Sequence, residues 1–529
     1  MDKNLVLAVV LSVAVYLGWF KFLEWRYGKP SDIPVAAQAS ISPGSPEPEL
    51  KGPKPERPAQ SGGLDGSSTF HVSDLQFKVQ PLGGGLVSYD YPGPLGRVEL
   101  VEDPFPGYFA AWPELRFERA GTDEHWPAFE ARLPSGVIVR KEYNFSGRDG
   151  MKTLRFTFTN PGKAAAAVEP WNLALGPGLG TVESERKENA GLWGAVALTP
   201  APEGKTREAF TEFKLSETPG ALEGPWLWAG VANRYFLAAV FPPPERFARV
   251  VYGAKGVDAL ASSWFGGQKM TRKLEPWLRL EAKAVAVPAG GSVVVEVPFY
   301  FGPKSFNQLS ALGKGLERSV SFGWFTTLGR FTLKVLNLFH RWTGNWGWSI
   351  VMLTLCLQAV LLPLSYKQMK SMAGMKKVQP ELQKIQQKFA KDPQRLQAEM
   401  MEVYKKHGVN PLGGCAPIVL QMPIFVSLFN MLRNNWELHG APWMFWIRDL
   451  SAHDPFYVLP LLMGGIMFLQ NKLNPQPAAD PAQAQMMTVM PVVMTFMFLS
   501  FPSGLVLYWL TNSLIGFASQ MAFKRRLEA

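Results

Sequence analysis

Ten uncharged polar side chains lie inside otherwise apolar stretches of the second half of the chain. They are Thr354, Gln358, Gln421, Ser427, Asn430, Thr488, Thr495, Thr511, Asn512 and Ser513. Polar groups are costly in lipid, so we expect these side chains to point inward. Two interpretations stay open: hydrogen bonds between neighbouring helices, or the lining of a hydrated cavity. No charge lies in the middle of these stretches, and no internal repeat occurs, which argues against an ion-coupled transporter.

The residue types that usually carry catalysis or bind metals form no recognisable motif. The six histidines are His71, His125, His340, His407, His439 and His453, and they show no metal-ligand spacing. The two cysteines, Cys356 and Cys415, fall in predicted membrane spans, so no disulfide framework supports the long soluble portion. No Walker-type glycine loop occurs. The sequence therefore predicts no catalytic group, no metal and no cofactor.

Six mostly apolar stretches are predicted to cross a membrane, at residues 5–20, 346–366, 411–432, 456–469, 486–501 and 505–523. Residues 367–408, between the second and third, hold ten Lys or Arg against four Asp or Glu. Short basic loops resist translocation, so this segment marks the cytosolic side. An even number of spans then places both termini in the cytosol, and the β region outside it. Six tryptophans are predicted at the outer membrane interface: Trp342, Trp346, Trp348, Trp436, Trp443 and Trp446.

The chain divides into five predicted parts. They are a first span (1–28), a Pro/Gly/Ser-rich tether (29–68), an all-β domain (69–304), an interfacial helix region (305–345) and a five-span core (346–529). Within the β domain, Leu154, Phe156 and Phe158 alternate with polar residues, as in a half-buried strand. Residues 284–287 and 293–297 are predicted to pair as a hairpin. The predicted fold is an α-helical polytopic membrane protein with a large all-β sandwich domain.

Residues 322–342 are predicted to form an amphipathic helix in the membrane interface, with a buried core helix as the alternative. Arg330, Lys334 and Arg341 are interleaved there with apolar and aromatic residues.

The basic segment is predicted to form a cytosolic helical hairpin over residues 369–408, with a solvated linker as the alternative. Val378, Leu382 and Ile385 repeat at helical spacing, and Asp392 followed by Pro393 is typical of a helix start. Its cationic face comprises Lys376, Lys377, Lys384, Lys388, Lys405 and Lys406.

Methionine is concentrated in the helical half, where seventeen of the twenty lie between Met352 and Met521. A flexible, polarizable side chain suits surfaces that contact many apolar partners, although gap-filling between helices is equally compatible. We expect an apolar sliding surface formed by Met486, Met490, Met494, Met497, Phe425 and Leu428.

Several sequence blocks resemble the YidC membrane-protein insertases. These blocks are Asn345-Trp346-Gly347-Trp348-Ser349-Ile350, Gln379-Pro380, Asn410-Pro411-Leu412-Gly413-Gly414-Cys415, Gln421-Met422-Pro423-Ile424-Phe425 and Phe501-Pro502-Ser503-Gly504-Leu505. The resemblance covers the whole chain and is that of the Gram-negative members with a large periplasmic domain. It implies a five-helix core, a cytosolic hairpin and a periplasmic β-supersandwich of sugar-mutarotase-like shape.

The resemblance also implies a hydrophilic groove open to the cytosol and to lipid. Such a groove usually carries an arginine five residues before the proline of the second span, and here Gln358 holds that position before Pro363. Thr354 matches a polar groove position, and Trp509, after Tyr508, stands where many members have a tyrosine. The predicted groove residues are Gln358, Thr354, Trp509, Tyr508, Gln421 and Asn430.

The sequence therefore predicts an inner-membrane insertase and chaperone rather than an enzyme. Its expected partners are nascent membrane proteins, the lipid bilayer, a Sec-type translocon, and a ribosome or targeting factor that binds the basic hairpin and the C-terminal tail. Specific nucleic-acid recognition is not expected. A polytopic membrane enzyme acting on lipid or glycan is the alternative.

Overall fold

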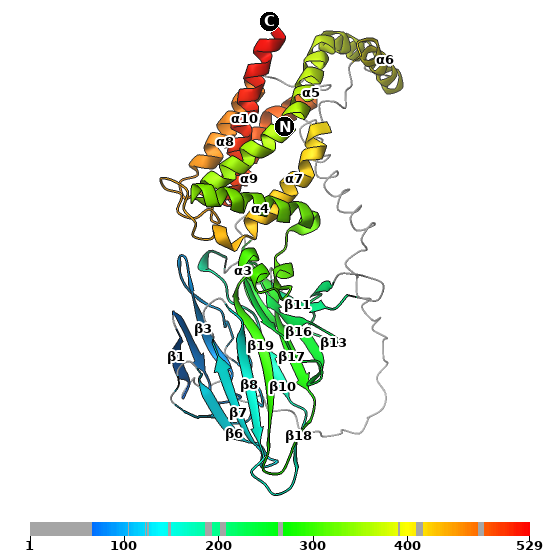
Figure 1. Cartoon of the computed structure of the whole chain (residues 1–529). Helices are drawn as coiled ribbons and strands as arrows, with labels where there is room; N and C mark the ends of the chain where they lie inside the picture. The colour runs from blue at the N-terminus through cyan, green and yellow to red at the C-terminus, as the bar shows by residue number, and fades with distance from the viewer. Residues whose placement is uncertain are drawn as a thin grey trace, which may run out of the picture.

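The computed structural model describes residues 66–528, apart from residues 73, 104, 122, 124–125, 146–149, 186–192, 202–207, 263–267, 390–391, 409–415 and 474–480. The predicted first span and most of the tether lie outside the described residues. The described chain forms a β domain and a helical part that are stacked end to end (Figure 1).

The β domain runs from β1 to β19. Its strands are β1 (Ser68–Val72), β2 (Leu75–Val79), β3 (Leu86–Gly93), β4 (Gly96–Glu99), β5 (Glu118–Arg119), β6 (Ala128–Arg132), β7 (Ile138–Asn144), β8 (Lys152–Thr159), β9 (Ala166–Val168), β10 (Asn172–Leu175), β11 (Gly194–Thr199), β12 (Ala209–Phe213), β13 (Gly220–Glu223), β14 (Trp228–Ala232), β15 (Phe236–Val240), β16 (Phe247–Ser262), β17 (Gln268–Ala282), β18 (Val285–Val287) and β19 (Ser292–Pro303). A short 3₁₀ helix, η1 (Glu183–Glu185), follows β10.

The helical part begins directly after β19. Its elements are α3 (Phe306–Ala311), η2 (Leu316–Ser319), η3 (Gly323–Phe325), α4 (Thr326–Thr343), α5 (Trp346–Lys388), α6 (Pro393–Lys406), α7 (Ala416–Arg433), η5 (Trp436–Leu438), α8 (Val458–Leu473), α9 (Pro481–Phe498) and α10 (Ser503–Glu528). Each predicted span after residue 345 overlaps one of α5, α7, α8, α9 and α10.

The β domain is a sandwich in which a nine-stranded sheet packs against two four-stranded sheets. The nine-stranded order is β12-β11-β14-β15-β19-β8-β7-β6-β5, and the smaller sheets are β1-β2-β3-β4 and β10-β17-β16-β13. Tyr89 of β3 stacks on Phe301 of β19 with ring centroids 4.5 Å apart, and Trp171, which precedes β10, contacts Phe156 of β8 at 4.6 Å. Both smaller sheets therefore cover the same face of the large sheet, which confirms the predicted sandwich.

The period-two prediction holds at β8. Leu154, Phe156 and Phe158 are completely buried in the sandwich core. The predicted hairpin of residues 284–287 and 293–297 is wrong, because β18 pairs with β9 while β19 pairs with β8 and β15. Alternation identifies the buried face of a strand and carries no information about its partner.

A second hydrophobic core joins the β domain to the helices. Trp228, Leu237 and Tyr300 lie on the other face of the large sheet and belong to one buried cluster with Leu309 of α3 and Leu428 of α7. The cluster continues through α4, α5, α8 and α10. The two parts therefore share a continuous apolar interior.

Trp436, in the loop between α7 and α8, inserts into the sandwich core itself. Its ring contacts Tyr91, Tyr235 and Phe236 at centroid distances of 6.4, 5.8 and 5.1 Å. One residue further on, Glu437 accepts a hydrogen bond of 2.7 Å from Ser305. The expectation that Trp436 lies at the membrane interface is therefore wrong, and this side chain fastens the β domain to the helical part.

One described helix, α5, is both long and apolar enough to cross a membrane by length and composition alone. Its 43 residues extend for about 65 Å at 1.5 Å per residue, twice a hydrocarbon core of about 30 Å. Its distal half packs against α6, and together they form a helical hairpin at the end of the helical part opposite the β domain (Figure 1). The count of six spans stays a prediction.

We predict that Trp436→Ala lowers the melting temperature of the purified protein by about 6–20 °C. Truncation of a buried tryptophan costs about 3–5 kcal/mol, and a folded unit of this size loses about 2–4 °C per kcal/mol. Differential scanning calorimetry in detergent measures the change. The matched control is Trp342→Ala, because Trp342 is 67% exposed and should be near neutral. An unchanged melting temperature for Trp436→Ala would show that the contact does not hold the two parts together.

Candidate functional site

Five polar side chains lie on packed faces of α5, α7 and α10 within the helical part: Thr354, Gln358, Gln421, Tyr508 and Asn512. We call this set the polar layer. The side-chain amide of Gln358 donates a hydrogen bond to Oδ1 of Asn512. Thr354 and Gln358 are four residues apart on α5, as are Tyr508 and Asn512 on α10, so each pair shares one helix face. The polar layer thus crosses from α5 to α10.

The polar layer is only partly closed. Gln358, Gln421 and Asn512 are half-buried, whereas Thr354 and Tyr508 are buried. The Tyr508 side chain hydrogen-bonds with Gln421 of α7, which ties a third helix to the layer. Thr354 donates to the carbonyl of Ile350 at 2.7 Å and so satisfies its hydroxyl within its own helix.

An aromatic wall borders the polar layer. Trp509 lies edge-on to Phe425 of α7 at 4.8 Å and contacts Phe498 of α9 at 5.2 Å. Its half-buried ring also lies 6.5 Å from the ring of Tyr508, centroid to centroid. Ser427 of α7 is completely buried, and its hydroxyl has no hydrogen-bond partner among the described residues. An unpaired buried hydroxyl of this kind costs about 1–3 kcal/mol.

Two predicted site residues lie elsewhere. Asn430 packs against Gly323 of η3, beside the β domain, and donates to the carbonyl of Val426 at 2.8 Å. It follows Gln421 by nine residues, which is about 13 Å along the helix, so the two side chains lie at different levels of α7. Leu428 was expected on an apolar sliding surface but is completely buried in the second core. Asn512 was not among the predicted groove residues, although its spacing of four from Tyr508 was a usable signal.

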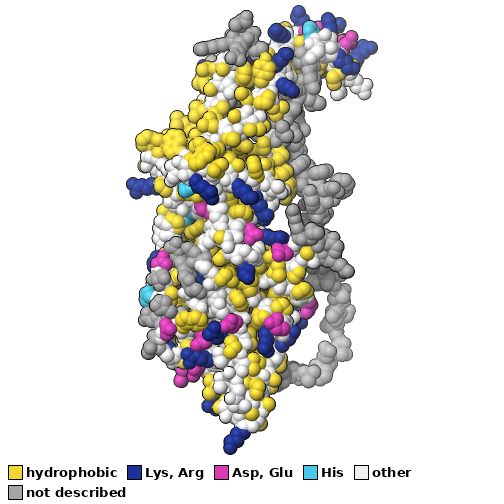
Figure 2. All heavy atoms as spheres, viewed as in Figure 1, with side chains coloured by type: hydrophobic (Ala, Val, Ile, Leu, Met, Phe, Trp, Pro, Cys, Tyr) yellow, Lys and Arg dark blue, Asp and Glu magenta, His cyan; other side chains and the backbone are white. Residues whose placement is uncertain are grey.

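The expected sliding surface is partly outward-facing. Met490 and Met497 of α9 are 42% and 36% exposed, while Met494 and Phe425 are half-buried against the second core. The side chain of Met486 lies outside the part of α9 whose side chains the structure describes. Figure 2 shows hydrophobic side chains over the visible face of the helical part. Exposed Val360, Leu461 and Phe496 are typical of a surface in contact with lipid.

The α5–α6 hairpin presents a basic surface around a small apolar seam. Val378 and Leu382 of α5 are buried against Val403 and Tyr404 of α6. The side chain of Asp392 caps α6 as predicted, accepting a hydrogen bond of 3.1 Å from the Arg395 amide. The predicted lysines are exposed except for Lys376, which is half-buried, and Lys406 lies 3.9 Å from Glu381. Figure 2 shows Lys and Arg side chains gathered on this hairpin.

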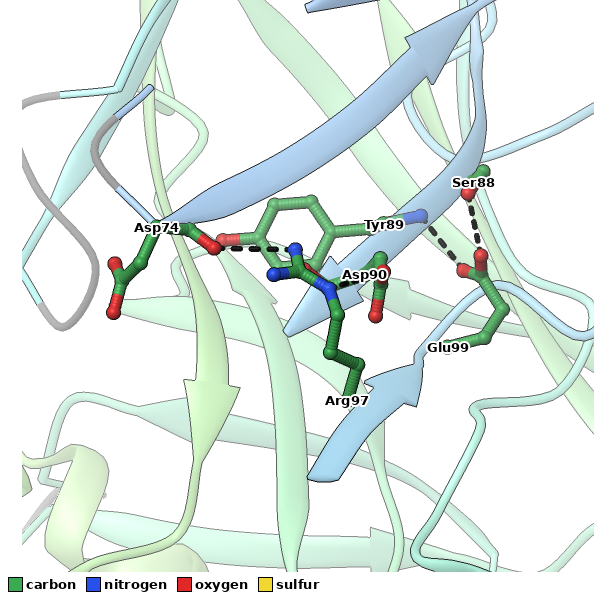
Figure 3. Close-up of polar contacts among 6 residues, drawn as sticks. All are labelled: Asp74, Ser88, Tyr89, Asp90, Arg97 and Glu99. Carbon is green, nitrogen blue, oxygen red and sulfur yellow. Dashed lines mark hydrogen bonds and ion pairs between the residues drawn. The ribbon is translucent and has the colours of Figure 1, made fainter. Parts of the chain in front are cut away.

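Polar side chains in the β domain form hydrogen bonds and ion pairs between neighbouring strands. Glu99 of β4 accepts hydrogen bonds from the Ser88 hydroxyl and the Tyr89 amide of β3, and Arg97 pairs with Asp90 (Figure 3). These contacts fix the register between neighbouring strands. Within the part of the chain that the structure describes, no group of three or more His, Cys, Asp or Glu is placed to hold a metal ion.

The chain is similar to known proteins over nearly its whole length. The family model described as 60Kd inner membrane protein matches residues 338–529, and the YidC periplasmic domain model matches residues 103–335. The membrane protein insertase YidC of Endomicrobium trichonymphae is 37% identical, with 83% of this chain and 81% of that protein covered. The one from Lawsonia intracellularis is 32% identical over 99% of both chains.

The solved structures that match this chain include an active YidC insertase with its first transmembrane domain resolved. It covers 85% of this chain and 91% of its own, at 18% identity and a TM-score of 0.38. A galactose mutarotase related enzyme from Lactobacillus acidophilus covers 44% of this chain and 97% of its own, at 9% identity and a TM-score of 0.29. Neither score reaches 0.5, so the family assignment rests on the sequence relatives.

The two matched family models define an inner-membrane protein that carries a periplasmic domain. Because its relatives exceed 30% identity across almost the entire length, the chain belongs to the YidC family of membrane protein insertases. The β domain is thereby the periplasmic domain, and the end of the helical part that adjoins it faces the periplasm.

We predict that Gln358 and Asn512 are energetically coupled. In a double-mutant cycle of Gln358→Leu and Asn512→Leu, the coupling free energy should be about 0.5–1.5 kcal/mol, the net value of one hydrogen bond. Reversible unfolding in mixed micelles provides the four free energies. Thr354→Val combined with Asn512→Leu is the control and should give no coupling, because Thr354 bonds to its own helix. Equal coupling in the two cycles would contradict a specific Gln358–Asn512 contact.

Proposed function

We propose that this protein inserts nascent membrane proteins into the inner membrane and acts as a chaperone for their folding. The observation that carries the proposal is the polar layer. Half-buried amides sit inside a helical part whose outer surface is apolar, in a chain that belongs to the YidC family. The relatives' names describe an insertase, and no arrangement of described residues favours an enzyme acting on lipid or glycan.

The role proposed for the polar layer follows from the free energies of moving a client's apolar segment and its charged flank into the membrane. Transfer of about 20 apolar residues into lipid gains about 6–12 kcal/mol, at −0.3 to −0.6 kcal/mol per residue. Each charged residue in a translocated flank costs about 2.5–3.5 kcal/mol at the bilayer centre, so two or three such residues cancel much of the gain. Polar groups partway across the membrane shorten the apolar path of the flank and lower that cost. No nucleotide is then needed.

Each element has a distinct role in this proposal. The flank of the client enters beside Gln358 and Thr354, with Tyr508, Gln421 and Trp509 as further lining. The apolar face of the client moves out along Met490, Met494, Met497 and Phe425 into lipid. The side chain of Gln358 both donates and accepts hydrogen bonds, so the layer acts through hydration rather than through a fixed positive charge.

The α5–α6 hairpin is the docking element in this proposal. Its exposed lysines suit the anionic surface of a ribosome or a targeting factor, and the basic C-terminal tail adds to it. Both termini then lie in the cytoplasm. Insertion takes place alone or alongside a Sec-type translocon.

We predict that Gln358→Leu reduces insertion of clients with charged flanks several-fold and leaves purely apolar clients nearly unaffected. The leucine removes one polar group and leaves Asn512 without its donor. Gln358→Arg should keep insertion within about twofold of the wild-type level, because a hydrated site already solvates charge. Protease protection of translocated flanks in proteoliposomes measures both variants. Full activity of Gln358→Leu on charged-flank clients would remove this residue from the mechanism.

We predict that deletion of residues 375–408 abolishes insertion and leaves the helical core folded. The hairpin has its own apolar seam, so its removal exposes little of the second core. Melting temperature reports the core, and insertion of ribosome-bound clients reports function. A milder variant replaces the exposed Lys377, Lys384, Lys388 and Lys405 by Gln, which keeps the seam and should weaken ribosome co-sedimentation. Collapse of the core on deletion would contradict a separate docking role.

A further inference from the structure

A polar cavity of about 670 Å³ lies between α4 and the elements that connect the β domain to the helical part. Phe306 of α3 and Glu317 of η2 line one side, and Arg330, Lys334, Asn337 and Arg341 of α4 line the other. We call it the basic pocket. Figure 1 places α4 along the junction between the β domain and the membrane helices. The pocket therefore lies at the level of the periplasmic surface of the membrane.

The pocket carries an excess of positive charge. Arg330, Lys334 and Arg341 follow one another at spacings of four and seven, which places them on one stripe of α4. None of the three forms an ion pair with any residue that the structure describes, and Glu317 is the only carboxylate in the lining. Burial lowers the pKa of His340, which also lines the pocket.

Two lining side chains have buried atoms without partners. Nε of Arg330 is buried and donates to no described residue, while its guanidinium lies 5.9 Å from the ring of Phe306. Oδ1 of Asn337 is likewise buried and unpaired within the described part of the chain, although its amide nitrogen donates to Asn307 at 2.9 Å. Unpaired buried groups are costly, and an arginine with a free donor is matched best by an oxyanion.

An apolar stripe lies next to the cationic stripe. Phe331, Leu338 and Trp342 each follow a pocket residue by one position, and they are 62%, 43% and 67% exposed. An amphipathic helix at the interface places such side chains among acyl chains and its cations among headgroups. Figure 2 shows Lys and Arg side chains at the lower edge of the hydrophobic region. The same helix can therefore contact both ends of one lipid molecule.

We propose that the basic pocket binds the phosphate of an anionic glycerophospholipid from the periplasmic leaflet. Arg330 is the buried donor, Lys334 and Arg341 supply charge at the rim, and the acyl chains lie along Phe331, Leu338 and Trp342. A phosphodiester presents two non-bridging oxygens, which share one negative charge, to the planar arginine fork. The net positive lining favours an anionic headgroup over a zwitterionic one, and the adjoining apolar stripe favours a lipid over free phosphate. A bound lipid would then brace α4 against α3 at the junction of the two parts.

The test uses the full chain purified in a neutral detergent and native mass spectrometry with added phosphatidylglycerol. Lys334→Gln combined with Arg341→Gln removes two rim charges without touching the core. We expect the dissociation constant for phosphatidylglycerol to rise about tenfold, because two exposed charges that attract the phosphate are lost. The control combines Lys314→Gln with Arg448→Gln, which removes one exposed lysine and one exposed arginine outside the pocket lining. It should leave binding unchanged.

Three further measurements test the arginine contact, the choice of lipid headgroup, and lipid against free phosphate as the ligand. Arg330→Lys keeps the charge and loses the fork, so weaker phosphatidylglycerol binding at an unchanged melting temperature would support the proposal. Phosphatidylcholine should bind at least several-fold more weakly than phosphatidylglycerol. Inorganic phosphate at millimolar concentration should not displace the lipid. Equal loss of binding in the two double variants, equal binding of both lipids, or displacement by inorganic phosphate would each overturn it.

Discussion

The structure depends on how polar groups are accommodated where water is scarce. A glutamine and an asparagine on α5 and α10 satisfy one another, and a tyrosine on α10 engages a glutamine on α7. Without these partners each half-buried amide would leave hydrogen-bonding groups unpaired on its packed side, which is costly. With them, the helices can be apolar on the outside and polar at one internal level. In the proposed function, that arrangement suits hydration of a passing flank rather than capture by a fixed charge.

The β domain and the membrane helices form one packed unit. The second core continues from Trp228 and Tyr300 of the large sheet through α3 to α4, α7 and α10, and Trp436 extends from the helical part into the sandwich core. A domain joined only by flexible segments would be free to move relative to the bilayer. Here the packing fixes its orientation, and α4 lies along the junction, where it contacts both parts. The periplasmic domain thus determines where α4 and its cationic stripe are held.

Local patterns in the sequence predicted elements well and contacts poorly. The alternation in β8 and the N-cap of α6 follow from periodicity and capping residues, and the long helices after residue 345 coincide with apolar stretches. The β18–β19 pairing failed because a period of two reveals a face and no partner. Trp436 was expected at the interface because a tryptophan beside a span is typical of that position, and only tertiary packing distinguishes it. The Gln358–Asn512 bond joins helices far apart in the sequence, so each residue could be expected to point inward but not toward the other.

The most direct test is site-specific photocrosslinking from position 358 to ribosome-bound nascent chains stalled at increasing lengths. A photoreactive residue at Gln358 should crosslink to the polar flank of a client at intermediate lengths and lose it once the apolar segment has entered lipid. The same residue at Leu461 of α8, which is 61% exposed on the lipid-facing surface, should show no such length-dependent crosslink to the flank. Absence of flank crosslinks at position 358, or equal crosslinks at both positions, would contradict a client path through the polar layer.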